Sequence, residues 1–478
     1  MVLVAEFLTM ESGGYPYGVN WSRPAESIAD TELLEAINCE YAVEGGNLRT
    51  AAGIVPVLET DAAVTSLFWD DVNGRMYYSS GGKLYMTKDF TSTTELGELA
   101  GTDRPCYSMF GDTCLVASGG HLQIVSAEGA LSGISGSPKV CAFVTVRCGR
   151  ALVCSMKDDA LSYSSIGDAT DWSESSNDTS KAQYVNIGYK EPGNIVALDF
   201  LAQAIMVYKE HGHAYKITGE PQDSNFSALS VSQTAFCALR AAVSVENKSY
   251  YLGETGLKSF MPTSAYGDVE PYDEGINANG RLNGHVDASA ALWRIPSRQQ
   301  LWLKAQEDKR LYIYHYMPRY NDGRGAFTMR ILQHDLHDVC DAGGTVYLAY
   351  GSKICHLDDG SATDDGAPIG MTLVSGKKLA QKHSILVMNR LLVVHDLIAG
   401  SGTLLCGKKK KPFSYGDEDE DAYHATMAAY DATGIAYNDA YTRSYRVGGG
   451  SNRYVQSILQ TTSGAMSLRT FRYEYLEV

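Results

Sequence analysis

Two histidines separated by one glycine have a spacing that could hold a metal ion. His211 and His213 lie in the stretch Gln203 to Glu220, which has the pattern of a β-hairpin. Alternate residues of a hairpin face one side, so both imidazoles could reach one ion. The sequence places no third ligand beside them. We therefore interpret the pair as turn residues and predict no metal site here.

A second group of possible ligands lies in the stretch QHDLHDVC. It contains His334, Asp335, His337 and Asp338. Imidazole and carboxylate groups at this spacing could share a metal ion. The alternative is the polar face of a loop or an edge strand, which carries the same residue types. We favour the loop or edge strand, and we expect no metal or other cofactor in this protein.

Motifs of known enzyme classes do not occur in a supporting context. This applies to GxSxG, HExxH, GxxxxGKS/T and GxGxxG. A glycosidase needs two positioned carboxylates, and adjacent pairs such as Asp70–Asp71 and Asp158–Asp159 would supply them. Such pairs are also common in turns, and nothing in the sequence selects one. We predict a binding or structural protein, not an enzyme, and assign no catalytic residues.

One turn resembles a motif of sialidase propellers. Asp168, Asp171 and Trp172 resemble the Asp-box turn S-x-D-x-G-x-x-W, but the spacing of Ser, Asp and Gly does not match it. We expect instead a structural turn in which Trp172 holds the end of a loop.

The elements that position these residues are short antiparallel hairpins. The stretch Gly74 to Phe90 contains an apolar strand, a turn with Gly81 and Gly82, and an alternating strand. Strand-based periods of about 40 to 50 residues are typical of propeller blades. We predict an all-β protein whose residues 61–360 form a six- or seven-bladed β-propeller. The pattern recurs at intervals of roughly 37 to 54 residues in Asp112 to Gly129, Gly149 to Gly167, Gln203 to Glu220, Asn247 to Pro262, Gln299 to Tyr316 and Gly343 to Gly360.

The two ends of the chain do not follow the repeat. In residues 1–60 we expect an N-terminal arm with a helix from Thr31 to Ile37, capped by Asp30, followed by entry strands. This segment either forms a hairpin that leads into the first blade or docks on a neighbouring subunit. Residues 361–478 contain apolar and alternating stretches, which predict an antiparallel β-sandwich-like domain. This domain contains a block of basic residues, Lys408–Lys411, followed by a block of acidic residues, Asp417–Asp421. Blocks of opposite charge so close together predict a solvated loop.

The bulk composition narrows the class of protein. The formal net charge is -16, so the chain lacks the basic footprint of a general nucleic-acid binder. The 10 Cys include no CxxC, and we predict reduced, mostly buried thiols. No apolar run has the length of a membrane span, and the apolar start lacks the basic region of a signal peptide. We expect a protein made in the cytosol, and kept or assembled there.

Three stretches of the sequence resemble one known family. The first is Leu33 to Val57, LLEAINCEYAVEGGNLRTAAGIVPV, where family members often have Arg-Pro-Gly or Phe-Pro-Gly and this chain has Ala51-Ala52-Gly53. The second is Gly81 to Phe90, and the third runs from Arg147 to Gly219. Together they resemble the tail-hub or nozzle family of short-tailed phages, the relatives of the packaged-DNA stabilisation protein. The resemblance spans most of residues 33–360.

The resemblance implies a structural virion protein of the tail, assembled in the host cytoplasm. Its β-propeller-like subunits would form a homo-oligomeric ring, expected as a hexamer, below the portal and the head–tail adaptor. The ring would extend the DNA channel, retain packaged DNA until ejection, and anchor tail spikes, fibres or a plug. We expect acidic side chains to line the channel, so that double-stranded DNA passes without sequence-specific binding. The alternative is a carbohydrate-binding or glycan-cleaving propeller of a tail or host-recognition component.

Overall fold

The structure is a computed structural model in which strands dominate. It describes residues 8–12, 15–43, 47–155, 159–175, 177–191, 193–201, 204–221, 226–263, 268–316, 325–379, 386–396, 400–406, 409–415, 440–446, 451–452 and 454–477. The helical segments in these ranges are the four-residue α1 (Asn279–Leu282) and a 3-10 turn at Pro296–Arg298. The predicted all-β class is confirmed.

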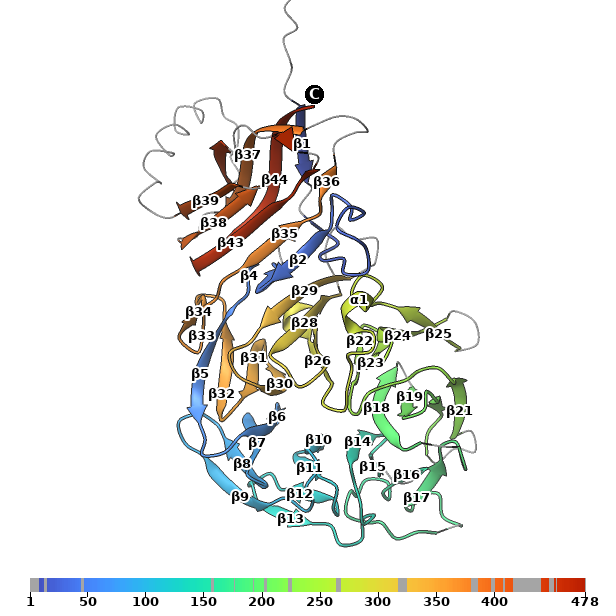
Figure 1. The fold of residues 1–478 in the computed structure, drawn as a ribbon. Helices are drawn as coiled ribbons and strands as arrows, with labels where there is room; N and C mark the ends of the chain where they lie inside the picture. The colour runs from blue at the N-terminus through green and yellow to red at the C-terminus, as the bar shows by residue number, and fades with distance from the viewer. Residues whose placement is uncertain are drawn as a thin grey trace, which may run out of the picture.

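Seven four-stranded antiparallel units, numbered here as blades 1 to 7, make up the larger part of the fold (Figure 1). Blade 1 consists of β6 (Val64–Asp70), β7 (Arg75–Ser80), β8 (Lys83–Thr87) and β9 (Thr94–Glu98). Blade 2 consists of β10 (Cys106–Phe110), β11 (Thr113–Ala117), β12 (Gln123–Val125) and β13 (Leu131–Gly133). Blade 3 consists of β14 (Phe143–Arg147), β15 (Arg150–Cys154), β16 (Ala160–Tyr163) and β17 (Gln183–Asn186). Blade 4 consists of β18 (Ile195–Leu201), β19 (Ala204–Lys209), β20 (Ala214–Thr218) and β21 (Ser227–Ser232). Blade 5 consists of β22 (Ala242–Val245), β23 (Lys248–Gly253), β24 (Gly256–Pro262) and β25 (Val269–Asp273). Blade 6 consists of β26 (Ala291–Ile295), β27 (Gln300–Lys304), β28 (Arg310–His315) and β29 (Ala326–Ile331). Blade 7 consists of β30 (Leu336–Ala342), β31 (Thr345–Tyr350), β32 (Lys353–Asp358) and β5 (Gly53–Glu59).

The hairpins predicted from the sequence are the second and third strands of these blades. In blade 1, Ser80 pairs with Lys83, so Gly81 and Gly82 alone form the loop between β7 and β8. Their φ angles are 58° and 80°. A two-residue hairpin loop of this kind needs positive φ at both positions, which glycine adopts without a steric penalty. A hairpin predicted from the sequence recurs in each of the seven blades, so the prediction of six or seven blades resolves to seven.

The ring of blades is closed by a strand from near the N-terminus. β5 pairs antiparallel with β32, with Ile54 opposite Leu357 and Gly53 opposite Asp358. The sequence analysis placed β5 in the arm of residues 1–60, whereas the structure makes it the outer strand of blade 7. The pairing joins residues about 300 positions apart, which a local sequence pattern does not reveal.

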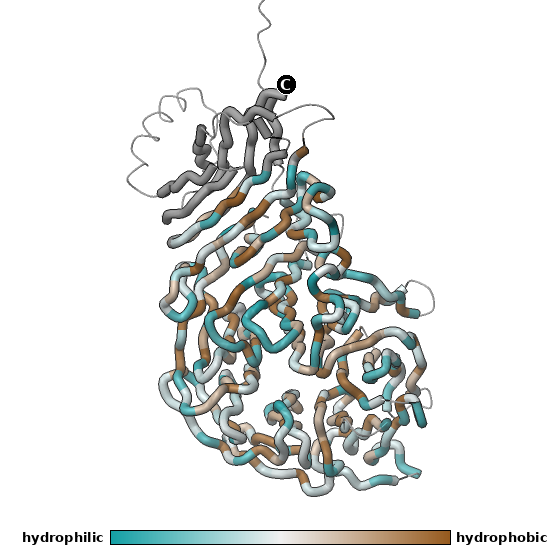
Figure 2. The backbone as a smooth tube through the Cα atoms, viewed as in Figure 1, coloured by the Kyte–Doolittle hydropathy of each residue, from teal (hydrophilic) through white to brown (hydrophobic). Residues whose placement is uncertain are grey.

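The hydrophobic core lies between neighbouring blades. Separate clusters join blades 7 and 1, 1 and 2, 2 and 3, 3 and 4, and 6 and 7, and one large cluster covers blades 4 to 6. In the cluster between blades 3 and 4, Leu152 and Ile205 are fully buried. The strands carry much of the hydrophobic sequence, and many of the loops are hydrophilic (Figure 2). Each blade therefore depends on its two neighbours for burial.

A single sheet connects the propeller to the second part of the molecule. The order of its nine strands is β26-β27-β28-β29-β2-β35-β43-β38-β39. The strands beyond blade 6 are β2 (Leu33–Ile37), β35 (Thr372–Ser375), β43 (Ser457–Gly464), β38 (Gly400–Cys406) and β39 (Lys409–Tyr415). β2 bridges β29 through Ile37 and Met329, and pairs antiparallel with β35. The helix predicted for Thr31 to Ile37 is wrong, because this pairing with distant strands overrides the local preference.

A second sheet of seven strands completes the C-terminal part. β3-β4-β44-β37-β40 forms its main path, with β1 against β44 and β41 against β37. Its strands are β1 (Leu8–Ser12), β3 (Cys39–Tyr41), β4 (Leu48–Thr50), β37 (Leu386–Asp396), β40 (Ala440–Arg446), β41 (Ser451–Asn452) and β44 (Ser467–Glu477). Short pairs are formed by β36 (Lys378–Leu379) with β42 (Tyr454–Val455) and by β33 (Thr363–Asp364) with β34 (Ala367–Pro368). Both C-terminal sheets thus include strands from the first 60 residues. The loop predicted at Lys408–Lys411 is wrong for Lys409–Lys411, because these residues pair with β38 as the start of β39. Lys408 and the predicted loop at Asp417–Asp421 lie outside the described residues.

Candidate functional site at the propeller axis

A cavity of about 300 Å³ lies at one mouth of the propeller axis. Its walls come from the first strands of several blades and the loops that precede them, and from the end of β27 and the turn after it. The charged and aromatic lining residues are Asp103, Arg104, Arg240, Trp293, Lys304, Glu307 and His337. The cavity therefore combines guanidinium, ammonium, carboxylate, imidazole and indole groups in one place.

Asp338, at the start of blade 7, is the centre of a buried polar cluster below this cavity. Its side chain is 8% exposed and pairs with the guanidinium of Arg104. The indole Nε1 of Trp293 donates to Asp338 Oδ1 at 2.9 Å, and the backbone N–H of Leu67 donates to Oδ2 at 2.8 Å. The guanidinium carbon of Arg104 lies 6.0 Å from the Trp293 ring centroid. Asp338 thus ties blades 1, 2, 6 and 7 together at the axis.

Arg240 reaches across the axis from the loop before blade 5. Its guanidinium donates to the carbonyl oxygen of Arg104 and, at 3.1 Å, to that of Ala142. It also lies 5.3 Å from the ring centroid of Phe143. No carboxylate in the described part of the chain lies within ion-pair distance of it. Burial lowers the pKa of Arg240, and the nearby charge of Arg104 acts in the same direction, while Cys106, Asp103 and Asp338 act against the shift.

Three further residues set the electrostatics of the cavity rim. Lys304 Nζ lies 3.1 Å from both carboxylate oxygens of Glu307, whose side chain is 59% exposed. Burial, followed by the charge of Lys304, lowers the pKa of His337. His337 is therefore neutral near pH 7 and presents one donor and one acceptor nitrogen.

The histidines that the sequence analysis singled out have different surroundings in the structure. His213 Nδ1 lies 3.2 Å from Glu191 Oε2, and His211 is exposed. His334 Nε2 contacts Asp365 Oδ2 at 2.9 Å, away from His337 at the axis. Within the described ranges, no three His, Cys, Asp or Glu side chains come together closely enough to hold a metal ion.

The carboxylates considered for catalysis have structural contacts. Asp70 is fully buried and accepts hydrogen bonds from the backbone of Asn73 and from Arg75 Nε, at 2.9 and 3.1 Å. It shapes the turn between β6 and β7, while Asp71 is exposed. Asp158, the partner considered for Asp159, lies outside the described residues. Asp159 Oδ1 pairs with the buried Lys209 Nζ at 2.7 Å.

The turn around Trp172 is held by local hydrogen bonds. Asp168 accepts from the backbone and hydroxyl of Thr170 at 2.8 and 2.7 Å, and these bonds lower the pKa of Asp168. Trp172 Nε1 donates to the carbonyl of Ala169 at 3.0 Å. These contacts match the structural turn that the sequence predicts.

Sequence analysis did not identify Arg104, Arg240 or Trp293. None of them lies in a recognisable motif, and they come together only when the ring of blades closes. The sequence offers one weak signal for this site. Arg240 is the single charged residue in the otherwise apolar stretch CALRAAV, just before a strand.

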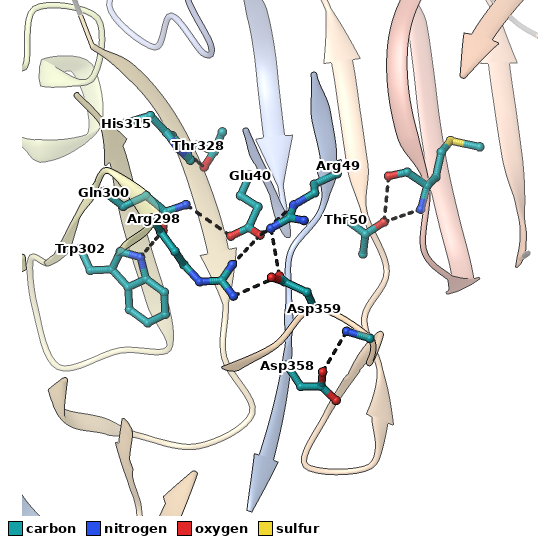
Figure 3. A network of polar contacts seen from close by, with 12 residues as sticks. Glu40, Arg49, Thr50, Arg298, Gln300, Trp302, His315, Thr328, Asp358 and Asp359 are labelled. Atoms are coloured by element: carbon teal, nitrogen blue, oxygen red, sulfur yellow. Dashed lines mark hydrogen bonds and ion pairs between the residues drawn. The ribbon is translucent and has the colours of Figure 1, made fainter. Parts of the chain in front are cut away.

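A second polar network joins the propeller to the C-terminal part (Figure 3). Glu40 on β3 lies 2.8 Å from Arg49 on β4 and 2.9 Å from Arg298, which precedes β27. Both arginines also contact Asp359, at 2.9 and 3.0 Å. Gln300 Nε2 donates to Glu40 at 3.3 Å. The network fixes the hairpin β3–β4 against blade 6 and the end of blade 7.

Seven four-stranded blades around an axis, with the last blade closed by a strand from the other end of the ring, define a β-propeller. The described helices include none that is long and apolar enough to cross a membrane. The nine cysteines whose side chains the structure describes form no disulfide.

No protein-family model matches the sequence, and no curated protein matches it. Among solved structures, PorZ of Porphyromonas gingivalis, described as a surface component of the type-IX secretion system, is 13% identical with a TM-score of 0.42. That match covers 77% of this chain but 46% of PorZ, less than half of its length. YCF48 bound to a D1 peptide is 10% identical with a TM-score of 0.44, covering 67% of this chain and 97% of that one. The WD40 β-propeller domain of Doa1 is 12% identical with a TM-score of 0.42, covering 64% and 96%. The propeller assignment rests on this chain's own strand order.

Proposed function

We propose that this protein is a structural subunit of a phage tail, a nozzle or tail hub that forms a ring below the portal and adaptor. In this role it extends the DNA channel, retains packaged DNA until ejection and anchors spikes, fibres or a plug. It acts without catalysis and belongs to the virion tail after assembly in the host cytoplasm.

The observation that carries the proposal is the stretch Leu33–Val57, the first of the three that resemble the nozzle family. In this fold it supplies β2, β3, β4 and the start of β5. These strands join blade 6 to the C-terminal sheets and close blade 7. A segment whose strands belong to the sheets of both parts suits a subunit that must transmit load within an assembly.

Charge and surface chemistry also support an architectural role. The net charge of -16 disfavours adhesion of DNA that moves past the subunit. Tyr184 on β17, Tyr189 in the turn that follows β17, and Leu229 on β21 are 56%, 69% and 52% exposed, and β17 contacts β21. Exposed aromatic and aliphatic side chains on adjoining strands are typical of protein interfaces. We refer to these three residues as the blade 3–4 patch.

The assembled mass tests the proposal. Native mass spectrometry and negative-stain imaging would be applied to the full chain, alone and with the cognate adaptor. A closed ring with an axial hole wide enough for duplex DNA, formed alone or on the adaptor, is the expected result. A chain that stays monomeric beside the adaptor would reject it. Sugar-array binding would then test the alternative, a glycan-binding propeller.

A further inference from the structure

The cavity at the axis holds a half-buried cation, Arg240, that forms no ion pair within the described part of the chain. The three cations of the cavity differ in their partners. Arg104 is paired with Asp338, and Lys304 with Glu307. Arg240 has two carbonyl oxygens and one aromatic face as partners. Carbonyl dipoles satisfy its donors but do not neutralise its charge.

The position of Arg240 is also held by the backbone. Its φ angle is 57°, in the left-handed region that residues with a side chain seldom adopt. Its N–H donates to the carbonyl of Val196 at 2.8 Å, which fixes this conformation. Strained residues of this kind persist where the surrounding structure enforces them, and they cluster at binding sites.

The acidic residues around the cavity do not form an ion pair with the Arg240 guanidinium. Asp103 lines the same cavity but forms no ion pair with Arg240, and Glu307 is engaged by Lys304 at the exposed rim. Asp338 has both oxygens occupied by Arg104, Trp293 and two backbone N–H groups. Asp103 and Asp338 are close enough for their charges to act on Arg240, but neither is in ion-pair contact with it. The cavity is therefore lined by an arginine whose guanidinium is free of a direct carboxylate contact among the described residues, together with neutral His337 and Trp293.

We propose that this axial cavity binds the anionic group of a small ligand, a carboxylate or a phosphate, with Arg240 as its charge partner. A volume of about 300 Å³ accommodates a ligand of several non-hydrogen atoms, about the size of malonate or a small phosphate ester. This site does not require the ring of subunits proposed above. The binding experiment can therefore succeed or fail independently of the proposed function.

Calorimetric titration of the full chain with inorganic phosphate and with malonate tests the site. Chloride keeps the ionic strength constant, and glycerol serves as a neutral probe. We expect a dissociation constant of about 1 mM or tighter for at least one anion, and no binding of glycerol. Binding of one anion only identifies which of the two groups the cavity prefers. Binding of neither anion would overturn the proposal.

Four variants separate charge recognition from structure. Arg240→Gln removes the charge and should weaken binding about tenfold or more, whereas Arg240→Lys keeps it and should retain most of the affinity. Arg23→Gln makes the same change at an exposed site and should bind like the unmodified chain. Ala288→Trp places a large side chain at an exposed position that lines the cavity, so it should narrow the cavity and leave the fold intact. If Arg240→Gln does not fold, this variant still tests whether the anion binds in the cavity. Unchanged affinity in both Arg240→Gln and Ala288→Trp would contradict the assignment.

Discussion

Glu40 joins three segments that are far apart in the sequence. Its side chain is 1% exposed and contacts Arg49, Arg298 and Gln300. Removing one charge of a buried network leaves the others uncompensated, which costs about 3 kcal/mol. We expect Glu40→Gln to lower the free energy of unfolding by about that amount, measured by urea titration.

Asp359 provides the matched control for this substitution. It contacts the same two arginines but is 55% exposed. Exposed ion pairs contribute about 0 to 1 kcal/mol, so Asp359→Asn should change stability little. Equal losses in the two variants would mean that burial does not set the strength of this network.

Asp199 is a buried carboxyl group that opposes stability at neutral pH. Burial raises its pKa from 3.8 to about 6, although Ser249 Oγ donates a hydrogen bond to it. Between these values the native protein binds a proton that the unfolded chain has released, so this group makes stability fall as the pH rises. Asp199→Asn should therefore raise the free energy of unfolding at pH 8 by about 3 kcal/mol.

The pH dependence distinguishes this cause from a packing effect. At pH 4 the Asp199 carboxyl is neutral in the native protein, so the gain from Asp199→Asn should largely disappear. Urea titrations at both pH values measure the difference, with the exposed Asp71→Asn as the control. A gain of the same size at pH 4 and pH 8 would point to packing instead.

At the scale of elements, β2 is the mechanical link between the two parts of the molecule. Ala36 is fully buried and pairs with Leu373 on β35. Proline in the interior of a central strand disrupts the ladder and costs about 3 kcal/mol or more. We expect Ala36→Pro to loosen the C-terminal sheets, so that limited proteolysis cuts between them and the propeller much faster. Ala63→Pro, in the exposed turn between β5 and β6, should leave the cleavage rate near that of the unmodified chain.

The elements also show which parts of the fold the sequence could reveal. The hairpins were predictable because a turn such as Gly81–Gly82 and its flanking strands are contiguous. β2 was mistaken for a helix because Leu33, Leu34 and Ile37 also fit a helical face, and its partner β35 is more than 300 residues away. The axial site could not be predicted, because Arg104, Arg240 and Trp293 meet only through the closure of the ring.

At the scale of the whole molecule, the blade 3–4 patch offers a test of assembly. Tyr184→Glu combined with Tyr189→Glu places charges on this patch, and we expect the proposed ring to be lost. Both side chains are more than half exposed, so stability should change by only about 0.5 kcal/mol per site. Native mass spectrometry gives the assembly state, and thermal melting verifies the fold. Ile276→Glu, at a residue that is also 56% exposed, is the control, and a ring that persists in the double variant would exclude this patch as the contact.

The strand that closes blade 7 has a consequence for synthesis of the chain. β5 emerges from the ribosome early, but its partner β32 follows about 300 residues later. At translation rates of about 5 to 20 residues per second, the wait is about 15 to 60 s. Until then the nascent ring is open, and the edges of its blades are exposed to other chains. Chaperone capacity during translation should therefore limit the yield of this protein more than its final stability does.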